Sequence, residues 1–205
     1  TDGVITLSTS PPNVLQVWIQ DENGGLAKAG AFVPMGDYEP LPEAKIPSGS
    51  VDLVSCFIGL HHITPEKLEP FVRSIHRVLR EGGLLIFSSL GPDTLRELRE
   101  ACSAVLPRAR PMPFVDMHDL GDMLVHSGFA EPVMDMERIE LTFVSPQRLL
   151  TELRELGRNL SVSRFAGLRT PSWQQQLCAA LQEKRGSSQG DGRLSLEFEV
   201  IYGHA

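Results

Sequence analysis

The chain of 205 residues is long enough to bury a sizeable core, and its 41% hydrophobic and 22% charged residues are typical of a globular protein. A net charge of −7 argues against a nucleic-acid-binding protein. The sequence holds no apolar run of membrane-spanning length and no signal-peptide pattern, so we expect a soluble, cytoplasmic protein without a membrane partner. Its cysteines, Cys56, Cys102 and Cys178, are widely spaced, which favours reduced thiols over disulfides or a metal site.

The charges are unevenly distributed along the chain. Residues 1–72 contain three lysines, no arginine and nine acidic residues, whereas all fifteen arginines lie further on. Solvated helix faces and chance would account for this pattern. The alternative is that the second part of the chain binds an anion.

The first half of the chain predicts alternating strands and helices. An apolar strand at 3–8 is followed by a predicted helix at 11–20, with Pro11 and Pro12 in its first turn. A short strand ends at Gly36-Asp37, and the stretch "VDLVSCFIGL" from Val51 reads as a strand buried on both faces. Thr64 is placed to cap a helix that Gly82-Gly83 ends, and residues 84–89 form the next strand.

The second half predicts helices at 93–106, 117–128, 145–160 and 171–185, a long strand or strand pair at 130–144, and a final strand at 193–205. Strand–helix units joined by short turns favour a parallel sheet with crossover helices. We therefore expect an α/β fold, with a doubly wound, mostly parallel sheet, helices on both faces and an antiparallel C-terminal hairpin. Residues 1–205 are expected to form a single domain, with residues 146–185 as a helical, lid-like insertion.

Several stretches in this order resemble the class I S-adenosylmethionine-dependent methyltransferases. They include "SVDLVSCFIGLHHI", "HRVLREGGLLIF" and "LVHSGFAEPVMDM". From "FSSLGPDTLRELREA" to the end, the chain resembles the malonyl-[acyl-carrier protein] O-methyltransferases of biotin synthesis. The resemblance implies a Rossmann-like fold, S-adenosyl-L-methionine as the cofactor, and methylation of the carboxyl group of a malonyl group on acyl carrier protein.

One feature of the family is not found in this sequence, the glycine-rich turn of the form GxGxG that follows its first strand. The sequence opens on what resembles the second strand, so we expect a fold without the first strand and cofactor binding that is weak or absent. This favours, as alternatives, a truncated or rearranged chain, or a non-catalytic methyltransferase-like protein that binds a partner. A small-molecule methyltransferase is a third interpretation.

The resemblance also implies a set of residues around the cofactor. Asp37 corresponds to an acid that often accepts a hydrogen bond from the adenine amino group, although it would equally serve as a turn residue. His61 would pack either on the ligand or in the core. The cofactor-binding candidates are Ser8, Asp37, Ser55, Gly59, Leu60 and His61.

A malonyl carboxylate is already ionised at neutral pH, so its methylation needs positioning more than a strong base. Arginine suits this task because its planar fork grips a carboxylate through two hydrogen bonds. The substrate candidates are Arg96, Arg99, Arg108 and Arg110, of which the first two would also fit a solvated helix face. The acidic carrier protein would need a basic rim, for which the candidates are Arg154, Arg158, Arg164 and Arg169; pairs within a helix are the alternative. No metal ligands and no oligomeric state are predicted.

Overall fold

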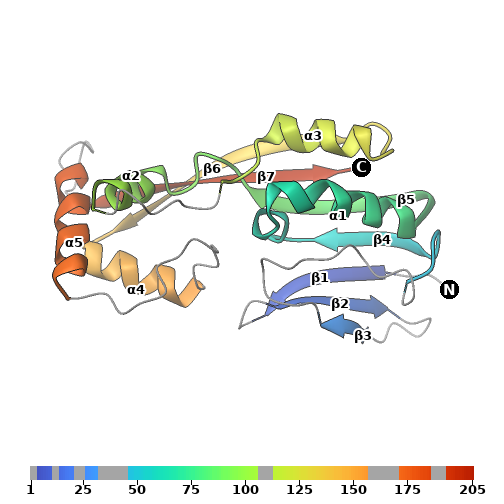
Figure 1. Cartoon of the computed structure of the whole chain (residues 1–205), viewed down its shortest axis with the longest axis horizontal. Coiled ribbons are helices and arrows are strands. Elements are labelled where there is room, and N and C mark those ends of the chain that lie inside the picture. Colours follow the sequence, from blue (N-terminus) through green and yellow to red (C-terminus); the bar gives the residue numbers. More distant parts are fainter. Residues whose placement is uncertain are drawn as a thin grey trace. The chain divides into compact units, whose positions relative to one another are not determined.

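The structure is a computed structural model that describes residues 4–10, 14–20, 26–31, 46–105, 113–156, 171–185 and 193–205 (Figure 1). The strands are β1 (Val4–Ser10), β2 (Val14–Gln20), β3 (Leu26–Ala31), β4 (Val51–Cys56), β5 (Leu79–Leu90), β6 (Val133–Phe143) and β7 (Leu194–His204). The α-helices are α1 (Pro65–Val78), α2 (Arg96–Val105), α3 (Met117–His126), α4 (Pro146–Leu156) and α5 (Pro171–Arg185), with a 3-10 turn η1 at Leu60–His62.

The described strands form one seven-stranded sheet in the order β3-β2-β1-β4-β5-β7-β6. Strand β4 pairs in parallel with both β1 and β5, so the predicted central position of β4 and β5 is confirmed. The α/β class and the antiparallel C-terminal strand β7 are also confirmed. The sheet is mixed rather than mostly parallel, because β1–β2 and β2–β3 pair antiparallel as well.

The predicted helix at 11–20 is wrong, since Val14–Gln20 is strand β2 and pairs with β1 from Ile5↔Ile19 to Ser10↔Val14. The segment VLQVWIQ contains β-branched and aromatic residues, which fit a pleated strand. The short strand predicted to end at Gly36-Asp37 lies largely outside the described residues. Strand β3 ends before it, at Ala31.

The helix predicted to run to Gly82-Gly83 ends earlier, at Val78, and β5 begins at Leu79. Leu79 pairs with Val51, the register then shifts, and Leu84 pairs with Leu53. Gly82 has φ +74°, a left-handed conformation that glycine adopts without steric cost. The two glycines therefore allow the irregular start of a strand instead of ending a helix.

The chain divides into two compact units. The first comprises residues 1–91, 113–137 and 200–205, and the second comprises residues 92–112 and 138–199. Helices α4 and α5, which cover the predicted lid, belong to the second unit. The single domain and the lid both stay predictions.

The first unit has a core of buried side chains from β4, α1, β5, α3 and β7, among them Val54, Phe71, Ile75, Phe87 and Ile201. The other face of β5 is less well covered, because Leu84 is 39% exposed. The apolar run of β5 therefore does not mark a strand fully buried on both faces. The second unit has its own core, formed by Ala101, Phe143, Leu149, Leu177, Leu181, Leu194 and Leu196.

Candidate functional site

The carboxyl ends of β1, β4 and β5 meet at one edge of the sheet in the first unit. Leu7 of β1 pairs with Cys56 of β4, and Cys56 pairs with Phe87 of β5. Ser8, one residue beyond Leu7, therefore lies at this edge, as does Ser55 of β4, which is 7% exposed. In open α/β sheets, ligands bind outside the carboxyl ends of the strands, so this edge is the candidate site.

The turn after β4 has a strained backbone at Ile58, whose φ is +47°. A positive φ is a steric outlier for a β-branched residue, and such conformations persist only where surrounding contacts hold them. The Ile58 amide donates a hydrogen bond of 2.8 Å to Oγ of Ser88, which lies in β5 and is 4% exposed. Ser88 thus holds the turn, while Phe57 and Ile58 remain 54% and 40% exposed.

Gly59 and Leu60 both have structural reasons for their residue type. A Cβ on Gly59 would lie 2.6 Å from Sγ of Cys56, so the close approach at this glycine is to the core. The Leu60 side chain is 3% exposed and packs in the same core. Any contact of these two residues with a ligand would therefore come from their backbone.

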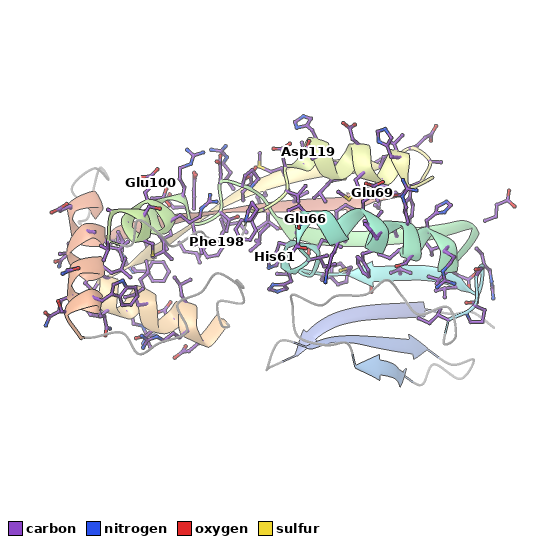
Figure 2. The ribbon with its side chains drawn as sticks, in the orientation of Figure 1. His61, Glu66, Glu69, Glu100, Asp119 and Phe198 are labelled. Atoms are coloured by element: carbon purple, nitrogen blue, oxygen red, sulfur yellow. The ribbon has the colours of Figure 1, made fainter. Side chains whose placement is uncertain are left out.

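His61 and His62 form a half-buried pair in η1, the segment between β4 and α1 on which Figure 2 labels His61. The two ring centroids lie 3.9 Å apart, and the His61 ring meets the Phe114 ring in an edge-on contact at 5.8 Å. Among the described residues, none makes a hydrogen bond with Nδ1 of His61, although this atom is buried.

Both histidines are held neutral. Burial, and then the charge of His62, lower the pKa of His61 to about 3, and burial lowers the pKa of His62 to about 4. At neutral pH each ring therefore has one N–H donor and one acceptor nitrogen. The site thus offers a neutral, buried hydrogen-bonding group at the end of β4.

Arg96 and Arg99 lie in the second unit, where each contacts its own chain. Arg96 forms an ion pair with Asp93, and Arg99 donates a hydrogen bond to the Pro92 carbonyl oxygen. Asp93 also pairs with Arg138 at 3.0 Å. These contacts hold the segment that leads into α2, and a substrate role for the two arginines stays a prediction.

Five predicted basic residues and one acid have no described environment. The residues that lie outside the described ranges are Asp37, Arg108, Arg110, Arg158, Arg164 and Arg169. Arg154 of α4 is described and exposed.

Sequence reasoning also missed two residues of the candidate site, Ser88 and Phe114. The Ser-Ser end of the apolar run LLIFSS was the available signal for Ser88, whereas nothing local pointed to Phe114.

Within the part of the chain that the structure describes, no cluster of three or more histidine, cysteine, aspartate or glutamate side chains could hold a metal ion. Cys56, Cys102 and Cys178 are free thiols, and burial raises the pKa of Cys56 to about 12. None of the described helices has the length and apolar character that a membrane span requires.

Comparison with known proteins gives a consistent picture. Residues 4–87 match a protein family described as a methyltransferase domain. The chain is 42% identical over 181 residues to the malonyl-[acyl-carrier protein] O-methyltransferase of Laribacter hongkongensis, covering 87% of this chain and 57% of that protein. It is 47% identical over 171 residues to the protein of the same name from Gallionella capsiferriformans, covering 82% of this chain and 56% of that protein.

Among solved structures, a Bacillus halodurans protein described as a methyltransferase has a TM-score of 0.51 and 19% identity, and the match covers 84% of this chain and 76% of that one. This likeness supports the fold. The resemblance predicted for the second half is confirmed and extends over most of the chain. The chain spans a little over half the length of these two curated relatives.

Proposed function

We propose that this chain acts as an S-adenosylmethionine-dependent methyltransferase that methylates the carboxyl group of malonyl-acyl carrier protein, in the cytoplasm and as part of biotin synthesis. The observation that carries the proposal is the 42% and 47% identity to relatives with this activity in their names, over more than four fifths of the chain. The match of residues 4–87 to a methyltransferase domain supports the cofactor.

The cofactor would bind at the carboxyl ends of β1 and β4. Ser8, Asp37, Ser55 and His61 would contribute side chains, and Gly59 and Leu60 would contribute backbone groups. Two features fit a ligand at this edge: the buried Nδ1 of His61, which has no hydrogen-bond partner among the described residues, and the strained turn at Ile58. When bound, S-adenosyl-L-methionine supplies a methyl group on a positively charged sulfur.

The protein's own residues would do the remaining work. The malonyl carboxylate is ionised at neutral pH and needs no strong base, so orientation and the exclusion of water are the main contributions, worth roughly 7–11 kcal/mol of the barrier in favourable cases. The proposed carboxylate-binding residues are Arg96, Arg99, Arg108 and Arg110. Arg108 and Arg110 remain the better candidates, because Arg96 and Arg99 already contact their own chain.

Two measurements test the proposal. Calorimetry with S-adenosylhomocysteine tests cofactor binding, and transfer of a labelled methyl group to malonyl-acyl carrier protein tests the reaction. Acetyl-acyl carrier protein, which has no free carboxylate, is the matched control and should stay unlabelled. Binding of S-adenosylhomocysteine without transfer to the malonyl carrier would favour another methyl acceptor, and absence of binding would favour a non-catalytic relative.

The choice of arginine can be tested separately. Arg110→Ala should lower kcat/KM for the malonyl carrier more than Arg110→Lys, because lysine keeps the charge and loses only the planar fork. The affinity for S-adenosylhomocysteine should be unchanged in both variants. Arg148→Ala is the control, since Arg148 pairs with Glu152 at 2.5 Å on the exposed face of α4. Unchanged kcat/KM in Arg110→Ala would move the assignment to Arg108.

A further inference from the structure

His61 occupies the one position of the candidate site at which a buried side-chain nitrogen lacks a hydrogen-bond partner among the described residues. Glu97 Oε2 and Ser127 Oγ are in the same condition, but of these atoms only His61 Nδ1 lies near the carboxyl end of β4. A buried polar atom without a partner is energetically unfavourable, so such atoms in native proteins usually serve a ligand, a water molecule or a functional need.

The surroundings of His61 restrict how its ring can turn. His62 contacts one side at a centroid distance of 3.9 Å, and Phe114 meets the ring edge-on at 5.8 Å. The preceding residues are fixed as well, because Gly59 packs on Cys56 and the Ile58 amide is bonded to Ser88. Packing therefore limits the movement of the ring, while no hydrogen bond to the described residues holds Nδ1.

We propose that Nδ1 of His61 donates a hydrogen bond to the carboxylate of the malonyl group and so positions the methyl acceptor. This inference rests on the proposed function and assigns His61 to the substrate instead of the cofactor. A carboxylate that leaves water for a half-buried site needs hydrogen-bond donors to replace its hydration.

The neutrality of the imidazole suits this role. A protonated imidazole near the end of β4 would place a positive charge close to the positively charged sulfur of the cofactor and repel it. A neutral N–H orients the carboxylate without this repulsion. Burial keeps the pKa of His61 far below neutrality, so the ring stays uncharged throughout the physiological pH range.

Three substitutions of His61 distinguish the role of Nδ1 from that of Nε2. In His61→Asn the amide nitrogen lies close to the position of Nδ1, whereas in His61→Gln it reaches the position of Nε2. His61→Leu removes both ring nitrogens, the donor and the acceptor, and replaces the imidazole with an apolar side chain of similar size. The control is His76→Asn, an exposed histidine of α1 that packs on Phe129 at a centroid distance of 5.1 Å, in the same unit and outside η1.

The readout is the preference for malonyl-acyl carrier protein over acetyl-acyl carrier protein. This preference is the dissociation constant of the acetyl carrier divided by that of the malonyl carrier, both measured with S-adenosylhomocysteine present. We expect His61→Leu and His61→Gln to lower this preference by roughly ten- to a hundredfold, the effect of one hydrogen bond to a charged group. His61→Asn should stay within about threefold of the wild type, and His76→Asn should match it. A general loss of folding would lower the affinity for both carriers together and leave the ratio unchanged.

The outcomes distinguish this inference from the proposed function. If the wild type prefers the malonyl carrier and His61→Leu keeps that preference, only the assignment of His61 is overturned. If His61→Leu instead lowers the affinity for S-adenosylhomocysteine, Nδ1 binds the cofactor, and the inference is again overturned. If the wild type binds both carriers equally, the methyl acceptor is a different molecule and both proposals fail.

Discussion

At Thr94 one hydroxyl group satisfies two backbone groups of a neighbouring strand. Its Oγ1 donates to the carbonyl oxygen of Glu199 and accepts from the amide of Glu199, both at 3.1 Å, and the side chain is 0% exposed. The Asp93 amide adds a bond of 2.7 Å to the Glu199 carboxylate. A short segment before α2 is thereby tied to β7 within the second unit.

We predict that Thr94→Val destabilises the protein, because valine keeps the shape and leaves two buried backbone groups unpaired. Each such group costs about 1–3 kcal/mol. Urea unfolding measures the difference. Thr151→Val in α4 is the matched control, since Thr151 is exposed and its hydroxyl bonds only to the Gln147 carbonyl, so its effect should stay within about 0.5 kcal/mol. Equal effects of the two substitutions would contradict the role assigned to Thr94.

At the scale of elements, Met134 of β6 lies near two glycines, one in α3 and one in β7, and the space beside these glycines differs. A Cβ on Gly121 of α3 would lie 3.8 Å from Cγ of Met134, which is an ordinary contact. A Cβ on Gly203 of β7 would lie 2.8 Å from Sδ of Met134 and 2.6 Å from Cε1 of Phe87. Strand β7 can therefore lie against β5 and Phe87 only because residue 203 has no side chain.

The same substitution at these two glycines should have opposite effects. Gly121→Ala should stabilise the protein by up to about 1 kcal/mol, because alanine is the better residue inside a helix. Gly203→Ala should destabilise it by about 1–3 kcal/mol through overpacking. Thermal or urea unfolding of both variants measures the signs. A stabilising Gly203→Ala would show that the packing between β7, Phe87 and Met134 is looser than described.

For the whole molecule, the two neutral histidines make stability depend on pH. The unfolded chain binds protons at His61 and His62 near their usual pKa of 6.5, whereas the folded chain binds them only near about 3 and about 4. Between these limits the unfolded state holds more protons, so stability rises with pH. The stability linked to these residues is therefore complete above pH 6.5 and falls as the solution is acidified toward pH 4.

As the pH falls from 6.5 to 5, protonation of each histidine in the unfolded chain should lower the free energy of unfolding by up to about 2 kcal/mol. This corresponds to roughly 1.4 kcal/mol per pH unit. Urea unfolding at pH 7, 6 and 5 measures the slope. The double variant His61→Asn/His62→Asn should have a flatter slope, because carboxylates contribute equally to both proteins and cancel in the comparison. Identical slopes would mean that both histidines already take up protons in the folded state.

The sequence by itself determined the features that depend on neighbouring residues. Helices α1 and α3 follow from apolar periodicity, with Thr64 and Pro65 at the start of α1 and Gly128 after the end of α3. Thr64 occupies the N-cap position without a side-chain capping bond, and these signals act within a few residues. The apolar runs of β4 and β5 likewise predicted two adjacent, central strands. The family resemblance and the site at the end of β4 also came from contiguous stretches, and these include Ser55 and His61.

Only the tertiary structure decided the features that depend on residues far apart in the chain. Residues 14–20 form a strand because β1 pairs with them, although Pro11 and Pro12 suggested a helix. Arg96 contacts Asp93, which also pairs with Arg138, 45 positions along the chain. Ser88 became part of the site through a bond to Ile58, 30 positions away. The pKa of His61 is lowered mainly by its burial, with the Phe114 ring beside it, and then by the charge of His62. Pairing, burial and charge of this kind arise when distant segments meet, and no local pattern encodes them.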